Sequence, residues 1–153
     1  MQDPEAIANW PLTLARDGAR TPLPWQAQSE QGGFTSSATP WLPLGEENMA
    51  RAVDRQDSDP ASLLNLTRAL LALRHQNAAL RNGGCEVVLA DAARLVLRRR
   101  SGSQSVLAVF NLSAAEAAWP DGLAAVGTPI FAVNGAELGR LPGFGAVIIQ
   151  ESI

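Results

Sequence analysis

A leucine-rich segment between residues 59 and 82 limits the folds open to this chain more than any other feature. Asp59-Pro60 offers a capping side chain followed by proline in the first helical position, and Asn82-Gly83-Gly84 would end a helix. Between them, leucines recur at the three- and four-residue steps of one α-helical face: Leu63, Leu66, Leu70 and Leu73. The segment predicts one helix with a broad buried face, whose packing partner need not lie in this chain.

Residues 85–153 have the pattern of β-structure. Short runs rich in valine, leucine and isoleucine alternate with turn signals. Asn134-Gly135 favours a two-residue hairpin turn, because both central positions of such a turn need positive φ and asparagine and glycine adopt positive φ readily. Val106–Phe110 is apolar throughout, as in a central strand covered on both faces. The pattern predicts a small antiparallel sheet or sandwich, with strands at Cys85–Leu89, Leu95–Arg99, Val106–Asn111, Pro129–Val133 and Ala146–Gln150.

Residues 1–58 show no sustained periodicity and contain most of the prolines, together with Trp10, Trp25 and Trp41. Disordered segments are poor in aromatic residues. The segment therefore predicts an irregular but ordered loop that lies over another part of a protein. We expect the indoles of Trp25 and Trp41 to anchor the loop to a core more readily than to stack on a ligand.

Composition excludes several classes of protein. Twelve basic residues against 15 acidic ones give a formal net charge of −3, and the basic residues are scattered, so nucleic acid is not an expected partner. No run approaches the ~20 apolar residues that span a bilayer, so no membrane contact is expected. The N-terminus lacks the features of a signal peptide. The single cysteine, Cys85, excludes an internal disulfide and is expected to be buried at a strand start. We expect a cytoplasmic protein.

One segment resembles a known family. Arg16–Trp25 has the sequence RDGARTPLPW and closely resembles a loop of α-glucosidases and oligo-1,6-glucosidases in the α-amylase superfamily. The flanking segment Pro40–Pro43 resembles the continuation of that loop, and the leucine-rich helix resembles the last helix of the family's barrel. Phe110–Ser113 and Leu141–Gly145 resemble a strand and a turn of its C-terminal β-domain. The resemblance covers essentially the whole chain.

The resemblance implies an α+β fragment: the last loop and last helix of a (β/α)8 barrel, followed by a small antiparallel, sandwich-like C-terminal β-domain. The expected division is residues 1–82 for the end of the catalytic barrel and 83–153 for the β-domain. In such barrels the chemistry takes place on the loops at the C-terminal ends of the strands. The loop over residues 1–58 would therefore cover a sugar pocket.

The resemblance also implies substrate-binding residues. Arg20 is the first choice for an arginine that contacts the innermost glucose, and Arg16 is the second, because a planar guanidinium can hold two hydroxyls or a carboxylate at once. A structural salt bridge is the alternative role for both. Asp17 either lines the site or braces the loop. His75, the only histidine, is expected to be a helix-end residue rather than a base or a metal ligand.

The implied function is that of the C-terminal portion of an α-glucosidase, which removes terminal glucose from α-linked oligosaccharides. Retaining hydrolysis needs two carboxyl groups ~5–5.5 Å apart. The resemblance implies that these, and a third aspartate, come from earlier barrel strands. We therefore expect no catalytic residue, metal ion or cofactor in this chain, and no activity of the chain alone. The alternatives are a trehalose- or sucrose-transforming relative and a stand-alone carbohydrate-binding module. Orphaned apolar faces predict self-association, or mobility of residues 1–58.

Overall fold

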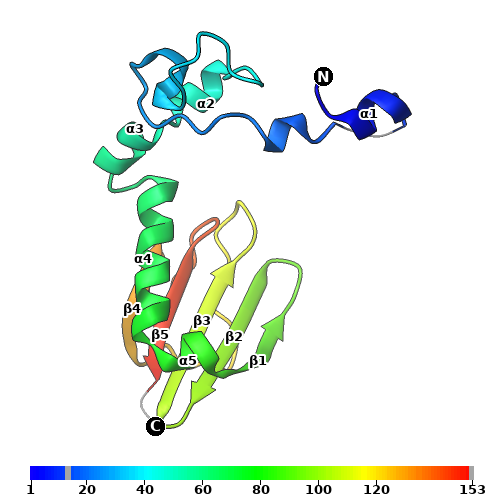
Figure 1. Cartoon of the computed structure of the whole chain (residues 1–153). Helices are drawn as coiled ribbons and strands as arrows, with labels where there is room; N and C mark the ends of the chain where they lie inside the picture. Colours follow the sequence, from blue (N-terminus) through cyan, green and yellow to red (C-terminus); the bar gives the residue numbers. More distant parts are fainter. Residues whose placement is uncertain (13–14, 152–153) are drawn as a thin grey trace. The chain divides into compact units, whose positions relative to one another are not determined.

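The computed structural model describes residues 1–12 and 15–151. The chain forms two compact units, Met1–Leu70 and Leu71–Ile153, which divide inside helix α4 (Leu63–Gln76; Figure 1). The expected boundary between residues 82 and 83 refers to the end of a barrel and the start of a β-domain, and it stays a prediction. The last two residues of that expected β-domain lie outside the described residues.

The first unit contains short helices where the sequence predicted irregular structure, so that expectation was wrong in part. Asp3 shows why: its side chain accepts a hydrogen bond from the Glu5 amide at 3.3 Å, and Pro4 occupies the first helical position. This is the same signature that was recognised at Asp59-Pro60. The helical elements are α1 (Pro4–Asn9), η1 (Arg16–Ala19), η2 (Glu30–Gly33), α2 (Glu46–Ala50) and α3 (Val53–Ser58).

The loop around Trp25 is closed by a tight turn at Gly32. The Gly32 carbonyl accepts hydrogen bonds from the Trp25 amide at 2.7 Å and the Gln26 amide at 2.9 Å. Gly32 has φ +62°, and a Cβ there would lie 2.9 Å from Cβ of Pro24, so the turn requires glycine. The indoles of Trp25 and Trp41 are at least half exposed. Within the described part of this unit they are not buried, and their role as anchors stays a prediction.

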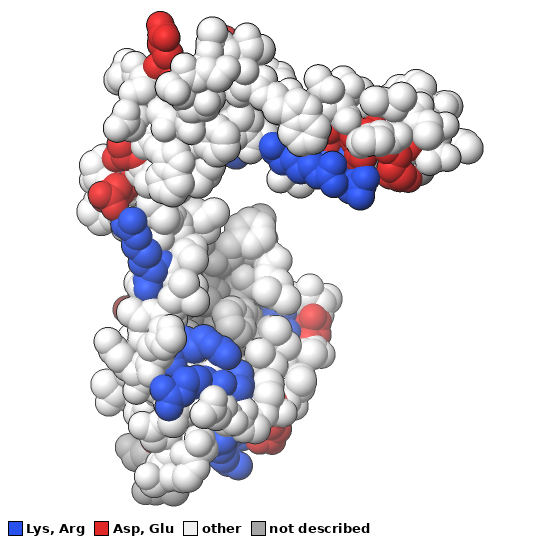
Figure 2. All heavy atoms as spheres, in the orientation of Figure 1, with Lys and Arg blue, Asp and Glu red and all other residues white. Residues whose placement is uncertain are grey.

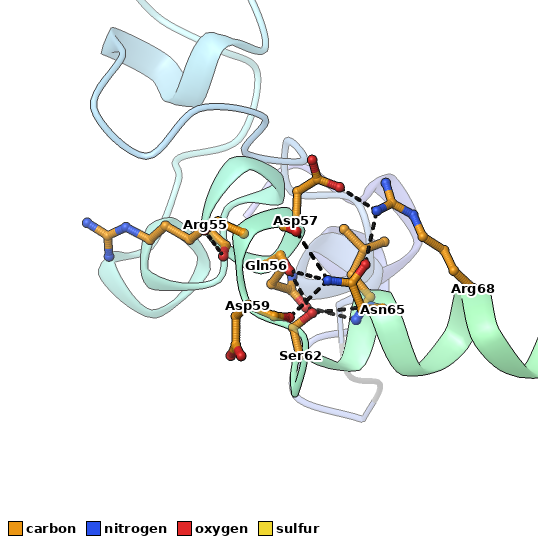
Figure 3. Close-up of polar contacts among 9 residues, drawn as sticks. Arg55, Gln56, Asp57, Asp59, Ser62, Asn65 and Arg68 are labelled. Atoms are coloured by element: carbon orange, nitrogen blue, oxygen red, sulfur yellow. Dashed lines mark hydrogen bonds and ion pairs between the residues drawn. The ribbon is translucent and has the colours of Figure 1, made fainter. Parts of the chain in front are cut away.

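Helix α4 begins later than predicted. The Asp59 carboxylate accepts a hydrogen bond from the Ala61 amide at 2.9 Å, which forms a turn instead of a helix start. The Ser62 hydroxyl then accepts from the Asn65 amide at 3.2 Å, as a capping residue does (Figure 3). No residue of α4 is buried, and Leu63 is 71% exposed. The predicted apolar face is therefore only partly covered: Leu73 packs against the buried cluster that contains Ala79 and Val106, whereas Leu63 and Leu70 are exposed.

The predicted single helix is two helices. α4 ends at Gln76, and α5 (Ala78–Asn82) follows after one residue, Asn77, which has an extended conformation. Oδ1 of Asn77 accepts from the Leu80 amide at 3.2 Å, and Nδ2 donates to Oε1 of Gln150 at 3.3 Å. An asparagine that can cap a new helix and bond to a strand competes with helix continuation, and this side-chain chemistry outweighs the leucine periodicity.

The five predicted strands are confirmed to within two residues at each end. They form one antiparallel sheet in the order β1-β2-β3-β5-β4 (Figure 1). The described strands make this one sheet, so the sandwich-like arrangement is not what the structure has. The strands are β1 (Gly84–Ala90), β2 (Arg94–Ser101), β3 (Gln104–Asn111), β4 (Thr128–Val133) and β5 (Ala146–Glu151).

The central position of β3 confirms the prediction from its apolar run. On one face Val106 and Ala108 pack with Ile148 and with Ala79 of α5. On the other face Leu107 and Val109 belong to a second buried cluster, whose remaining members are Val96, Ala136, Leu141, Val147 and Ile149. Helix α5 thus covers one face of β2 and β3, and the connections after β3 contribute to the cover of the other (Figure 1).

Asn111, in the segment Phe110–Ser113 that resembles a strand of the family's β-domain, connects those segments to the sheet. It is buried, and its Nδ2 donates to the carbonyls of Ala115, Leu141 and Pro142 at 2.7, 3.1 and 2.9 Å. Its Oδ1 accepts from the amide and the hydroxyl of Ser113. Every donor and acceptor of this side chain is therefore satisfied within the unit.

Of two finer expectations, one was right only in part and the other was wrong. Asn134 and Gly135 do have positive φ, 53° and 69°, and the Ala136 amide donates to the Val133 carbonyl at 3.1 Å. However, β5 starts only at Ala146, so this turn leaves β4 without joining it directly to β5. Cys85 is exposed, because β1 is an edge strand whose side chains have little cover. No helix within the described residues is long and apolar enough to cross a membrane.

Candidate functional site

The predicted site residues lie around a carboxylate that the sequence analysis did not select, Asp3. Nε of Arg16 donates to Oδ2 of Asp3 at 2.7 Å, and Nη2 donates to Oδ1 at 2.6 Å. The Arg16 amide also donates to Oδ2 at 2.9 Å. The Asp3 side chain is fully buried, whereas the Arg16 side chain is half exposed. Arg16 therefore forms a bidentate ion pair with Asp3, and this pair joins the N-terminus of α1 to η1.

The ion pair fixes both charges. Hydrogen bonds from the Arg16 side chain, and then from its amide, hold the pKa of Asp3 well below its usual range. The Asp3 carboxylate in turn raises the pKa of Arg16. Figure 2 shows acidic and basic side chains side by side over the segment that carries α1 and η1. At neutral pH Asp3 is an anion and Arg16 a cation, and neither acts as a proton donor or acceptor.

Arg20 is held more loosely. Its amide donates to the Asp17 carbonyl at 2.9 Å, which closes η1. Nη1 of Arg20 lies 3.9 Å from Oδ1 of Asp3, beyond hydrogen-bonding distance, and the side chain is 38% exposed. The Arg20 guanidinium is thus oriented by the same carboxylate but keeps donors for another group.

Asp17 braces the chain on the same side of η1. Its Oδ2 accepts from the Gln2 amide at 2.7 Å, so it joins η1 to the residue before Asp3. Its Oδ1 is buried and has no hydrogen-bond partner among the described residues. Arg16, Asp17 and Arg20 therefore lie together in and beside η1, and their role in substrate binding stays a prediction. His75 lies exposed in the last turn of α4, as expected for a helix-end residue.

Asp3 was missed although the sequence contained its signal. Asp3-Pro4 has the capping pattern that was recognised before the leucine-rich helix. What the pattern does not provide is the partner, because Arg16 lies 13 residues away, across a segment without periodicity. The cluster as a whole can present one guanidinium, that of Arg20, against a fixed negative charge. It contains neither a nucleophile with an adjacent base nor a pair of carboxyl groups that share a proton.

The comparisons with known proteins show the family to which the chain belongs. The family model "Alpha amylase, catalytic domain" matches residues 1–83. That match covers more than half of the chain, and the chain belongs to the α-amylase family. The fold expected for the N-terminal part, a segment of an α-amylase-type catalytic domain, is therefore confirmed at this coarse level.

Individual relatives show which members of the family the chain resembles. The chain is 44% identical over 113 residues to a probable α-glucosidase of Rhizobium meliloti (strain 1021), covering 74% of the chain and 20% of that protein. It is 36% identical over 121 residues to a probable oligo-1,6-glucosidase of Bacillus subtilis (strain 168), covering 77% of the chain and 21% of that protein. Among solved structures, the α-glucosyl transfer enzyme XgtA is 37% identical with a TM-score of 0.81, covering 98% of the chain and 29% of that enzyme. The chain spans about one fifth of the length of these curated relatives.

Proposed function

We propose that this chain supplies the C-terminal part of an α-glucosidase and that Arg20 contacts the glucose unit bound in the active site. The observation that supports this most directly is the cluster of Asp3, Arg16 and Arg20. Asp3 and Arg16 satisfy each other, whereas Arg20 is oriented but retains donors. A guanidinium of this kind can donate two parallel hydrogen bonds to neighbouring sugar hydroxyls or to a carboxylate that itself contacts the sugar.

In this proposal the roles are divided between two parts of one enzyme. The bond-breaking step is retaining hydrolysis, in which a carboxylate attacks the anomeric carbon and a carboxylic acid protonates the departing oxygen. Both groups would come from earlier strands of the barrel. Arg20 would fix the orientation of the glucose ring, and Asp3 and Arg16 would hold the loop that carries Arg20. Positioning of this kind affects the rate because reacting groups must be held within a short distance of one another. Asp17 would brace the same loop through Gln2.

Glucosyl transfer is the second candidate for the parent enzyme. The observation that favours it is the 37% identity to XgtA, which is described as an α-glucosyl transfer enzyme. Hydrolysis and transfer share the attack on the anomeric carbon and differ in the acceptor, water or a second sugar. The acceptor side of the pocket would be formed by residues outside this chain.

A chimera tests the proposal. The aligned segment of the Rhizobium meliloti relative is replaced by that of this chain, and hydrolysis of p-nitrophenyl α-glucoside is measured. We expect an active chimera in which Arg20→Ala lowers kcat/KM by about 10- to 100-fold, the range expected for lost hydrogen bonds from a charged group. Arg55→Ala, a change of another exposed arginine, is the matched control and should leave kcat/KM unchanged.

The outcomes of the chimera experiment separate the candidates. A chimera that unfolds cooperatively but keeps the same activity after Arg20→Ala would contradict the proposed role of Arg20. Product analysis with maltose as both donor and acceptor would distinguish glucose release from transfer. For the chain alone, we propose no glycosidase activity, and turnover of the same substrate that Arg20→Ala abolishes would overturn this. The expected cytoplasmic location stays a prediction.

A further inference from the structure

The segment that follows Arg20 alternates buried and exposed residues, so it has two different sides. Pro22 and Pro24 are buried, whereas Leu23 and Trp25 are half exposed. Proline has no backbone N–H, so neither buried residue can donate a hydrogen bond that would hold the segment in place. Carbonyl groups and the residues at the two ends of the segment must therefore fix its position.

The start of helix α3 supplies the missing donors. The first N–H groups of a helix have no partner within it. The Val53 amide donates to the Pro24 carbonyl at 2.9 Å, and the Asp54 amide donates to the Trp25 carbonyl at 3.1 Å. The first turn of α3 is thus paired residue by residue with the segment after Arg20.

The carboxylate of Asp54 adds a contact in the opposite direction. Both of its oxygens accept from the Ala27 amide, Oδ1 at 3.1 Å and Oδ2 at 3.0 Å. Asp54 therefore donates to Trp25 through its backbone and accepts from Ala27 through its side chain. At the other end of the segment, Nδ2 of Asn48 donates to Oγ1 of Thr21, the residue next to Arg20, at 3.3 Å.

Helix α3 is itself fixed to the start of α4, so Asp54 rests on a defined frame. Nδ2 of Asn65 donates to the carbonyls of Gln56 and Asp59 at 3.0 and 2.9 Å (Figure 3). The Ser62 hydroxyl donates to the Gln56 carbonyl at 2.7 Å, and Oε1 of Gln56 accepts from the Leu64 amide at 3.2 Å. The C-terminal end of α3 is held by α4, while its N-terminal end holds the loop.

We propose that Asp54 is a positioning residue: it fixes Pro24–Ala27 and, through that segment, the direction of Arg20. The role in sugar binding rests on the proposed function of Arg20. The fixing of the segment by Asp54 does not, and it can be measured without any substrate.

Amide hydrogen exchange of this chain tests the first step. We expect Asp54→Ala to accelerate exchange of the Ala27 amide about tenfold, because that amide loses its charged acceptor. Asp54→Asn keeps one acceptor oxygen and should give a smaller acceleration. Asp57→Ala is the matched control, because it also removes an exposed carboxylate from α3. The Asp57 carboxylate pairs with Arg68 and does not contact Pro24–Ala27. Unchanged slow exchange at Val106–Val109 of β3 shows that the sheet of each variant is folded.

An Ala27 amide that exchanges at the same rate in Asp54→Ala and in the unaltered chain would overturn the proposal. So would equal acceleration in Asp57→Ala, which would indicate general loosening of α3.

The link to Arg20 is tested in the chimera by a double-mutant cycle. We expect Asp54→Ala to raise KM for p-nitrophenyl α-glucoside about three- to tenfold in the presence of Arg20 and to have no further effect in the Arg20→Ala background. Additive effects would overturn the link, because Asp54 would then act independently of Arg20. Failure of the proposed function gives a different result: Arg20→Ala has no effect on activity, while the exchange rate of Ala27 still reports on Asp54.

Discussion

At the residue scale, the most consequential side chain of the N-terminal unit is Asp3, which caps α1, binds Arg16 through both carboxylate oxygens and lies near Arg20. A carboxylate that accepts several hydrogen bonds is strongly favoured in its charged form. The same side chain therefore performs a structural task and sets the charge beside the candidate sugar-binding arginine. Its removal would affect both.

The lowered pKa of Asp3 predicts a pH dependence with a definite sign. A group whose folded pKa is depressed stabilises the fold above its unfolded pKa, about 3.9 for aspartate, and the stabilisation is lost as the pH falls through the folded pKa. We expect carbon NMR of the carboxyl group to show Asp3 still ionised at about pH 3. In Arg16→Ala the titration should move up toward the ordinary aspartate range. Arg55→Ala is the control, and an unchanged titration in Arg16→Ala would contradict the assignment of cause.

Asn111 predicts a large stability effect in the second unit. Replacement by alanine removes three hydrogen bonds to the carbonyls of Ala115, Leu141 and Pro142, each of which keeps one other donor, and leaves the Ser113 amide without its acceptor. We expect Asn111→Ala to lower the free energy of unfolding by about 2–4 kcal/mol, the order for several hydrogen bonds lost from a buried side chain. Urea unfolding followed by the β-sheet circular dichroism signal measures this. A loss below about 0.5 kcal/mol would show that water replaces the side chain.

At the element scale, the strands were predictable and the helix boundaries were not. The apolar run Val106–Phe110 has one arrangement that buries both of its faces, a central strand, and the structure places it there. The leucine pattern could not reveal the break at Asn77, because that pattern does not show that Asn77 caps α5 and bonds to Gln150, a residue far away in sequence. For the same reason the pairing of Asp3 with Arg16 could not be derived. The candidate site was found from local sequence likeness, whereas the contacts that orient it are non-local.

The break between α4 and α5 predicts a measurable capping effect. Asn77→Ala removes the side-chain acceptor of the Leu80 amide and the contact with Gln150. We expect the free energy of unfolding of the second unit to fall by about 1–2 kcal/mol, the usual range for loss of a helix cap. Asn82→Ala, at the exposed end of α5, is the matched control and should change it by less than about 0.5 kcal/mol. Equal losses in the two variants would argue against a specific role of Asn77.

At the scale of the whole molecule, each unit exposes large apolar side chains. Trp10 and Trp41 are each 63% exposed in the first unit, and Val87 and Phe144 are similarly exposed in the second. The chain also spans only about one fifth of the length of its curated relatives. Exposed apolar surfaces of this kind are typical of faces that pack against further protein.

This exposure predicts that the isolated chain self-associates. We expect the mass from size-exclusion chromatography with light scattering to rise with concentration. The chimera is the comparison, because there the same surfaces can pack against the rest of the enzyme, and its mass should not depend on concentration. A concentration-independent monomer of this chain would contradict the prediction.

The two buried prolines beside Leu23 and Trp25 have one further consequence. An extended apolar segment with free N–H groups on its edge is a template for cross-β growth, in which other chains add as strands. Pro22 and Pro24 have no N–H to offer, and the carbonyl of Pro24 is already bonded to α3. The segment can therefore present an indole and a leucine to further protein while it remains a poor template for fibril growth.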